Sequence, residues 1–458
     1  MNKTYQTKRD SFKQFPIAGA LIFSLLLLSW TILAWGQPLP LDLATVRQLA
    51  VANNPQLKVA QKDRNRAWSQ VKASFGGLLP TVATYSSYQR AWELPTIFFD
   101  NPDPTGPPKI SFKVGQTHTL VTGIKFEQPL FLGGAAWNGY QLAKLGYDLT
   151  ESQYEMTQES VLLDATTAYL SLLFARLLID MSQQAVETAD ENLQQVREMK
   201  KVGKASRFDV LRAEVQLASV KPQLISAQNN VRLAESRLRM VLNLPANQKL
   251  LVTETLQYVP DPLLGEKVED LVQMAFEKRP EMQALVTQKA MAQKQVDISR
   301  STLTPKVMFS TTYQYQGEKE TTDFTQDDFF KSFNSSISIN LPLFSGWQNQ
   351  TQIQQAKINQ RILDDQEAML QQAIREEVES AFFTIQEAEE KVLSQIKLVE
   401  QAQEALRLAQ LRYREGSSTQ LDVMNAEVAL NQARMSHYQS LFEYNLARTQ
   451  LQKALNQL

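Results

Sequence analysis

The chain has 458 residues, enough for two or three ordinary domains, and 43% of them are apolar. Its net charge of −1 gives no basic field for nucleic acid, and the lack of cysteine together with only two histidines excludes disulfides, thiol catalysis and Cys/His zinc sites. We find no nucleotide-binding loop, nucleophile elbow or metal motif, so we expect a protein that is not an enzyme and needs no cofactor.

The N-terminal segment has the pattern of a secretory signal. Basic residues precede an apolar run that ends near Ala34-Trp35-Gly36, where the small residues fit a signal-peptidase site. We therefore predict a signal peptide at residues 1–36, with an uncleaved membrane anchor as the alternative. Beyond residue 37 we find no stretch of about 20 apolar residues, so a mature protein inside a membrane is expected to be a β-barrel.

The rest of the chain is an internal duplication. Residues 129–245 align with residues 342–458 at one constant offset, and a second offset aligns the residues upstream. The difference between the offsets is an insertion in the first copy, rich in turn-forming residues, that predicts an exposed loop. We assign the first structural repeat to 37–245, a linker to 246–267 and the second structural repeat to 268–458.

Each repeat has the same order of predicted elements: a helix, a pair of strands, a very long helix, a glycine turn and a second long helix. The first helices are expected at about 43–77 and 268–303. Residues 347–415 contain no glycine or proline, and at 1.5 Å per residue a helix of this length reaches roughly 100 Å. The strands are predicted at 80–92 with 117–131, and at 305–316 with 332–344.

The second long helix of each repeat shows a seven-residue apolar period, which predicts left-handed coiled-coil packing. In the second copy the large positions are Val423, Leu430, His437, Tyr444 and Leu451, and small residues follow three positions later. His437 therefore has a predicted packing role rather than a metal-binding one. Pro222 lies inside the corresponding helix of the first copy and predicts a local kink.

The predicted strands alternate between apolar and polar residues, as strands of membrane barrels do. A half-buried sheet of a water-soluble protein gives the same alternation and remains the alternative. In the barrel interpretation Lys125 and Glu127 face the lumen. Four strands cannot close a barrel, because about eight is the practical minimum, so the chain is expected to oligomerise.

The two turns share one motif. Residues 200–217 (KKVGKASRFDVLRAEVQL) and 413–430 (YREGSSTQLDVMNAEVAL) each contain a glycine followed six residues later by Asp-Val. A serine or threonine precedes each aspartate by three residues, the spacing of a capping box, and the glycine is suited to end the preceding helix. The residues are Gly203, Ser206 and Asp209 in the first copy, and Gly416, Thr419 and Asp422 in the second.

This duplicated layout and its paired turns, Val202-Gly203…Asp209-Val210 and Gly416…Asp422-Val423…Ala426-Glu427, resemble the TolC-like outer-membrane factors, the outer membrane efflux protein family. The resemblance covers essentially the whole mature chain. It implies a mainly α fold with a membrane β-barrel, in which a homotrimer forms one 12-stranded barrel and a periplasmic α-helical tunnel.

The resemblance also implies the function and the partners. Such a protein is a passive outer-membrane channel-tunnel that extends into the periplasm and serves a tripartite efflux pump or a type I secretion system. Its implied partners are outer-membrane lipid, a periplasmic adaptor (membrane fusion protein) and an inner-membrane pump or ABC exporter.

A periplasmic gate at the helical tip is implied as well. By the resemblance Asp422 faces the lumen, while Asp209 and Tyr413 take part in polar links that hold the tip closed. This chain departs from the family's prototype at Ser418, which replaces an arginine, and at Asn425, which replaces a second aspartate. The expected gate therefore has one acidic ring and looser links, and gating is compatible with capping. Candidates for adaptor contact, or else an ordinary solvated turn, are Val202, Gly203, Lys204, Ala205, Gly416, Ser417 and Ser418.

Two other classes of protein stay open at this point. A periplasmic adaptor also combines a secretory signal with a long helical hairpin, but it should show one hairpin between β-rich halves. A trimeric coiled-coil scaffold without a through-channel leaves the two strand pairs unexplained.

Overall fold

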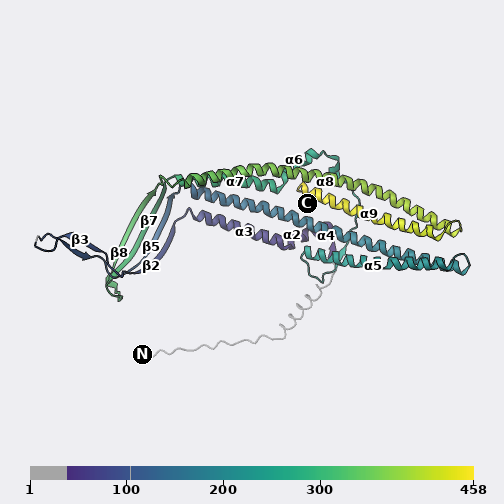
Figure 1. Cartoon of the computed structure of the whole chain (residues 1–458), viewed down its shortest axis with the longest axis horizontal. Helices are drawn as coiled ribbons and strands as arrows, with labels where there is room; N and C mark the ends of the chain where they lie inside the picture. Colours follow the sequence, from purple (N-terminus) through teal and green to yellow (C-terminus); the bar gives the residue numbers. More distant parts are fainter. Residues whose placement is uncertain (1–38, 104) are drawn as a thin grey trace, which may run out of the picture. The chain divides into compact units, whose positions relative to one another are not determined.

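The computed structural model describes residues 39–103 and 105–458, so the predicted signal peptide lies outside the described residues. The chain is mainly helical, and Figure 1 shows two long helical hairpins with a separate set of strands. Helices α4 (Ala135–Lys201) and α8 (Gln348–Arg414) have 67 residues each. The helices that follow the turns, α5 (Arg207–Val241) and α9 (Gln420–Ala454), have 35 residues each. These matching lengths confirm that the duplication in the sequence is a duplication in structure.

The first helix of each repeat is divided in two, which the sequence analysis missed. In the first repeat α2 (Leu43–Asn53) is followed by α3 (Pro55–Gly76), and in the second α6 (Val268–Lys278) is followed by α7 (Pro280–Arg300). The residue before each proline is extended, because the proline ring disfavours the helical conformation of its predecessor.

Four antiparallel strands form the main sheet, in the order β2-β5-β7-β8. They are β2 (Thr81–Arg90), β5 (His118–Phe131), β7 (Lys306–Lys319) and β8 (Phe329–Asn340). Both predicted strand pairs are confirmed, and the central pairing of β5 with β7 joins the two repeats. In this single chain β2 and β8 are edges without a second neighbouring strand.

The register confirms that the two faces of this sheet differ. On one face Tyr313 lies between Ile124 and Phe333, and Phe333 is 69% exposed. On the other face Lys125 and Glu127 form an ion pair of 2.7 Å, beside small hydroxyl side chains of β7. The apolar face therefore has no cover within the described chain, while the charged pair lies on the polar face.

The insertion in the first copy is more ordered than the predicted loop. It forms a two-stranded hairpin of β3 (Thr96–Asp100) and β4 (Lys109–Lys113), and the rings of Phe99 and Phe112 meet across it with centroids 5.9 Å apart. A short parallel pair, β1 (Leu39–Leu41) with β6 (Leu250–Val252), connects the start of the described chain to the linker. A short 3₁₀ helix, η1 (Pro262–Gly265), follows in the linker, η2 (Ser301–Leu303) ends α7, and η3 (Gln326–Asp328) precedes β8.

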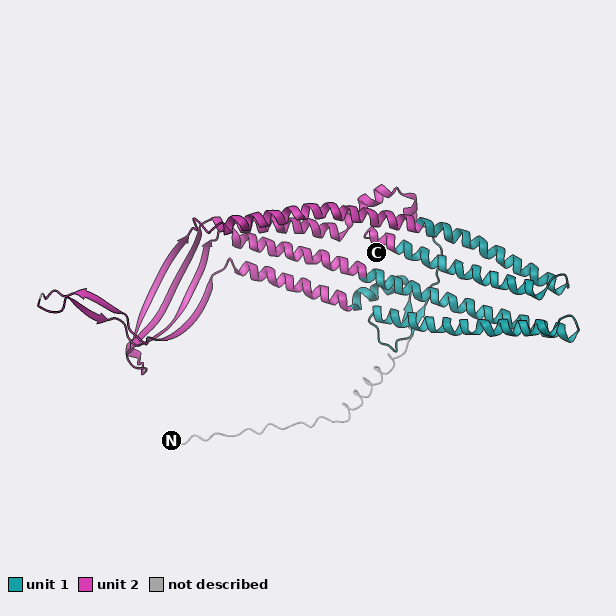
Figure 2. Ribbon diagram, viewed as in Figure 1, with its two compact units in different colours: residues 1–54, 161–260, 386–449 teal, residues 55–160, 261–385, 450–458 magenta. Residues whose placement is uncertain are grey.

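The chain divides into two compact units, and each unit takes elements from both repeats (Figure 2). Unit 1 contains the described residues up to Asn54 together with Val161–Pro260 and Gln386–Thr449. It therefore holds both glycine turns and the helices next to them. Unit 2 contains Pro55–Ser160, Asp261–Ile385 and Gln450–Leu458, and it holds the four-stranded sheet.

One expectation about hydrophobicity needs correction. Among the described residues, α4 contains an 18-residue window that is long and apolar enough to cross a membrane by length and composition. Half of that window is buried inside the fold, as in the core helix of a packed unit.

The predicted heptads are largely confirmed by burial. Val423, Leu430, Tyr444 and Leu451 are each at most 5% exposed, as expected for large core positions, whereas His437 is only partly buried. Burial lowers the pKa of His437, and its Nδ1 has no hydrogen-bond partner among the described residues. Helix α5 continues without interruption through Pro222.

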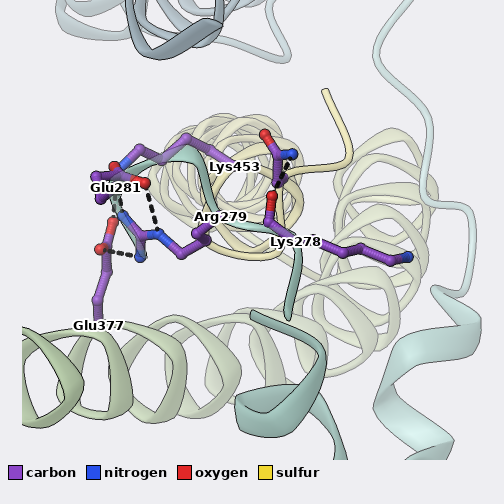
Figure 3. Close-up of polar contacts among 6 residues, drawn as sticks. Lys278, Arg279, Glu281, Glu377 and Lys453 are labelled. Atoms are coloured by element: carbon purple, nitrogen blue, oxygen red, sulfur yellow. Dashed lines mark hydrogen bonds and ion pairs between the residues drawn. The ribbon is translucent and has the colours of Figure 1, made fainter. Parts of the chain in front are cut away.

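A buried ion-pair network lies in unit 2 at the junction of α6 and α7 (Figure 3). Arg279 is 4% exposed; its guanidinium donates to Glu281 at 2.9 Å and to Glu377 of α8 at 2.5 Å. Lys453 of α9 also contacts Glu377, at 2.6 Å. Burial alone would raise the pKa of Glu281, but the hydrogen bonds from Arg279 lower it. This one arginine therefore connects α7 to α8, and α9 joins through Lys453.

We expect Arg279→Ala to lower the free energy of unfolding by about 3 kcal/mol, because it leaves the partly buried Glu281 without its cation and removes one of the two cations of Glu377. Thermal or chemical unfolding of the purified protein in detergent measures this loss. The control is Arg375→Ala, which removes an exposed ion pair with Glu379 at 3.7 Å and should cost at most about 0.5 kcal/mol. Equal losses in the two variants would show that the buried network does not stabilise unit 2.

Candidate functional site

The candidate site is the pair of turns in unit 1, which lie side by side at one end of the two hairpins (Figure 1). Each long helix ends at a glycine in the left-handed region, with φ of 75° at Gly203 and 76° at Gly416. The amide of Lys204 donates to the carbonyl of Met199 at 2.9 Å, and that of Ser417 donates to Arg412 at 2.9 Å. This is the Schellman pattern, which satisfies carbonyls at the helix end and favours glycine because most side chains are strained in the left-handed region.

Each following helix begins with a capping box, which confirms the structural interpretation of the two aspartates. In the first copy the amide of Ser206 donates to Oδ2 of Asp209 at 2.8 Å, and the amide of Asp209 donates to Oγ of Ser206 at 3.2 Å. In the second copy Thr419 and Asp422 make the same reciprocal bonds at 2.9 and 3.3 Å. The paired bonds satisfy amides that a helix start leaves unpaired.

The second turn holds its carboxylate more tightly than the first. Ser418 Oγ donates to Oδ2 of Asp422 at 2.7 Å, a bond with no counterpart at Asp209 among the described residues. The backbone amide of Thr419, with the hydroxyls of Ser418 and Thr419, lowers the pKa of Asp422 to about 2. Asp422 is therefore ionised throughout the physiological pH range, and its side chain is exposed.

A small apolar cluster joins the two hairpins just behind the turns. Its buried members come from α4, α5, α8 and α9, and Ala205 of the first turn packs against it. They are Leu193, Val196, Val210, Ala213, Leu406, Tyr413, Val423 and Leu430. The turns are thus held together by side chains of both repeats, at the positions that the heptads predict.

Comparison with known proteins identifies the architecture. The model of the outer membrane efflux protein family matches residues 46–244 and 271–457, which is most of both repeats. The chain belongs to the outer membrane efflux protein family. It is accordingly an outer-membrane exit channel of an efflux or secretion system that extends into the periplasm.

The relatives and solved structures agree with this assignment. Outer membrane protein TolC of Vibrio cholerae is 21% identical over 427 residues, which cover 91% of each chain. The Campylobacter jejuni CmeC outer membrane channel has the same fold, with a TM-score of 0.72 at 19% identity over 91% of this chain and 85% of that one. The outer membrane protein VceC from Vibrio cholerae gives a TM-score of 0.72 at 17% identity, covering 90% of this chain and 95% of that one. The family match favours the exit channel over the adaptor and the scaffold.

The predicted gate residues of this efflux protein come together at the tip, with one difference from the expected contacts. Tyr413 is buried in the apolar cluster, and burial, followed by the nearby charge of Asp209, raises its pKa. Within the described chain the hydrogen bonds of Asp209 go to Ser206 and not to Tyr413. Asn425 is exposed on α9. The link between Asp209 and Tyr413 therefore stays a prediction, as does the role of Asn425.

The predicted adaptor-contact residues differ in accessibility. Val202 is 71% exposed and Lys204 is exposed beside it. Ser417 Oγ donates to the carbonyl of Arg412 at 3.2 Å, and Ser418 is engaged with Asp422. Val202 and Lys204 thus have exposed side chains, whereas the hydroxyls of Ser417 and Ser418 donate to groups of their own turn.

Two buried polar residues near the tip are not predicted by the sequence. Glu427 is 4% exposed and Gln420 is 2% exposed. Neither the amide oxygen nor the amide nitrogen of Gln420 has a partner among the described residues. The repeated Ala-Glu-Val motif marks Glu427 as a residue of interest, but its burial cannot be read from the motif.

We expect Thr419→Ala to loosen the start of α9 by about 1 kcal/mol, since it removes half of the capping box. Hydrogen exchange of the backbone amides at 420–424 should become about fivefold faster. Ser417→Ala is the control, because Ser417 bonds only an exposed carbonyl at the other side of the turn. Unchanged exchange in Thr419→Ala would mean that the cap contributes nothing to the stability of the tip.

Proposed function

We propose that three copies of this efflux protein form one channel, in which twelve strands close a barrel in the outer membrane. The support is the sheet itself, whose edges β2 and β8 have free backbone groups in the single chain. In hydrocarbon each unpaired group costs several kcal/mol, and four strands are too few to close a barrel alone. Pairing β8 of one copy with β2 of the next removes both edges of the four-stranded sheet.

In this proposal one face of the sheet contacts lipid and the other faces the lumen of the barrel. The exposed aromatic and aliphatic side chains on the face of Phe333, Ile337 and Ile339 are suited to contact lipid. Lys125 and Glu127 are then lumen residues, as the sequence predicted, and their 2.7 Å ion pair keeps their charges balanced. A neutralised pair of this kind imposes little charge selectivity at the barrel, which leaves selectivity to the other end of the channel.

We further propose that the helical tip is a gate with an acidic ring at Asp422. The observation that carries this proposal is the geometry of the carboxylate. Every hydrogen bond it receives within the described chain ends on Oδ2, so Oδ1 is left for solvent or for a passing cation. Three such fixed charges around a narrow pore attract cations and repel anions. Capping and gating are then two roles of one side chain, since the cap fixes where the charge stands.

The partners in this proposal are those of the family resemblance. A periplasmic adaptor would contact the turns, where Val202 and Lys204 are exposed, and an inner-membrane pump or ABC exporter would supply the energy. The channel itself is passive.

Asp422→Ala should raise the conductance of the channel in planar lipid bilayers and lower its cation-to-anion permeability ratio about threefold or more, because the ring loses its charge. The unmodified channel should keep its selectivity from pH 8 down to about pH 4, because the pKa of Asp422 is about 2 and the carboxylate stays ionised above it.

The matched control is Asp209→Ala, which removes the equivalent capping box from the first copy. Both variants lose a cap, but only Asp422→Ala should change selectivity if the second hairpin lines the pore. The same selectivity change in both variants would reduce the role of Asp422 to capping, and no conductance from a folded trimer would overturn the channel proposal.

A further inference from the structure

A buried carboxyl lies behind the proposed acidic ring, on the same helix. Glu427 is five residues after Asp422 on α9 and is 4% exposed. Asn192 of α4, 8% exposed, donates from Nδ2 to Oε1 of Glu427 at 3.4 Å. The contact joins the first hairpin to the second, and no cation forms an ion pair with Glu427 in the described part of the chain.

The surroundings of Glu427 are polar but do not neutralise it. It borders a cavity of about 130 Å³ between α4, α8 and α9. The titratable or charged groups around it are Glu191 of α4, Tyr413 and Arg414 of α8, and, beside an adjoining small cavity, Arg434 of α9. Arg434 donates to Gln184 at 3.0 Å rather than to the carboxylate. The cavity is large enough for water, which would hydrate the carboxylate if the helices moved apart.

The duplication shows what is unusual about this glutamate. Its equivalent in the first copy, Glu214, is only partly buried, with 42% of its side chain exposed, and forms an ion pair with Arg197 at 2.7 Å. In the second copy Gln410 occupies the position equivalent to Arg197 and lines the cavity beside Glu427. Both copies therefore have the glutamate, but in the second copy a glutamine stands at the position of the cation, and the carboxyl is buried without an ion pair among the described residues.

We propose that Glu427 and Asn192 form a proton-dependent latch, which holds the two hairpins of one chain together while Glu427 is neutral and releases them when it ionises. Glu427 acts as a positioning residue for the gate. The inference rests on the proposed gating function of the tip.

The direction of the pH effect follows from burial. Burial raises the pKa of Glu427 to about 7, an effect that the hydrogen bond from Asn192 reduces in part. When α4 and α9 separate and water reaches the carboxyl, its pKa returns toward the ordinary value. The closed tip is therefore fully stabilised at acidic pH, and it loses stability as pH rises through about 7.

The open-to-closed ratio of the unmodified channel should rise about tenfold between pH 6 and pH 8, the increase that one carboxyl with a pKa near 7 gives by linkage. Single-channel open probability in planar bilayers measures this ratio. Glu427→Gln, which mimics the neutral carboxyl, should give a low open probability that does not vary with pH. Glu214→Gln is the matched control and should keep the full pH response.

Asn192→Ala separates a latch from a merely structural contact. It removes the donor that stabilises the ionised carboxylate, so the midpoint of the pH response should move to higher pH. In a Glu427→Gln background the same change should leave open probability independent of pH. Assembly is checked for each variant by its trimer content in detergent, and the single variant Asn192→Ala still tests the latch if Glu427→Gln does not assemble.

Two other groups titrate near neutral pH and provide further controls. Burial lowers the pKa of His437, while burial and the nearby charge of Glu281 raise the pKa of Glu159 to about 7. A pH response that disappears in His437→Gln or Glu159→Gln, and persists in Glu427→Gln, would overturn the latch. A conducting channel with a selectivity change in Asp422→Ala but no pH response would also overturn it and leave the gate intact. The absence of any conductance would count against the gate itself, and hence against both proposals.

Discussion

Each long helix in this chain has to end without leaving its last carbonyl groups unpaired, and the way this requirement is met determines much of the rest. Four helix ends use the same Schellman pattern, with a residue of positive φ at Gly203, Asn243, Gly416 and Asn456. The two glycine ends lead directly into a capped helix and so place a carboxylate at each turn. The two asparagine ends instead donate to the backbone of the short helices, Asn243 to Asn53 at 3.3 Å and Asn456 to Lys278 at 2.9 Å. The same need to pair the last carbonyl groups of a helix therefore shapes the two glycine turns and also the two asparagine ends, which bond to the short helices.

The duplication preserves this backbone solution but not the charges around it. The residue before the proline is Asn54 in the first copy, where its side-chain amide donates to the carbonyl of Val241. In the second copy it is Arg279, which pairs with Glu281 and Glu377, and Lys453 joins through Glu377. At the tip it is the first copy that has the cation: Glu214 pairs with Arg197, whereas Glu427 has no ion pair within the described chain. The two copies therefore share their helix lengths, turns and caps, but they differ in the charged groups around them. The proposed gate uses this difference, since it gives the acidic ring and the buried glutamate to the second hairpin.

Much of the fold could be predicted because its determinants are local or periodic. The long helices follow from the absence of glycine and proline, the capping boxes from a spacing of three residues, and the strand pairs from alternation. The division at Asn54 and Arg279 was also readable from the following prolines and was missed. The β3–β4 hairpin could not be predicted from the sequence. Its segment is rich in turn-forming residues, and the contact between Phe99 and Phe112 across the two strands is not visible in the composition. The burial of Glu427 was not readable at all, since it depends on Asn192, a residue 235 positions away in the sequence.

The packing of the tip explains why a gate can be built there. Behind the turns the apolar cluster is small, and it is interrupted by buried polar groups at Asn192, Gln420 and Glu427. A buried polar group without a full set of partners costs about 1–3 kcal/mol, a cost that is recovered when water enters. The contact between the hairpins is therefore weaker than an apolar heptad seam of the same length would be. Parts of a protein that move are drawn from its less stable regions, and in the proposed channel the buried glutamate makes the stability of this region depend on pH. Glu427→Leu would pack the two hairpins more tightly against each other. It would raise the free energy needed to separate them and would abolish the dependence of that free energy on pH.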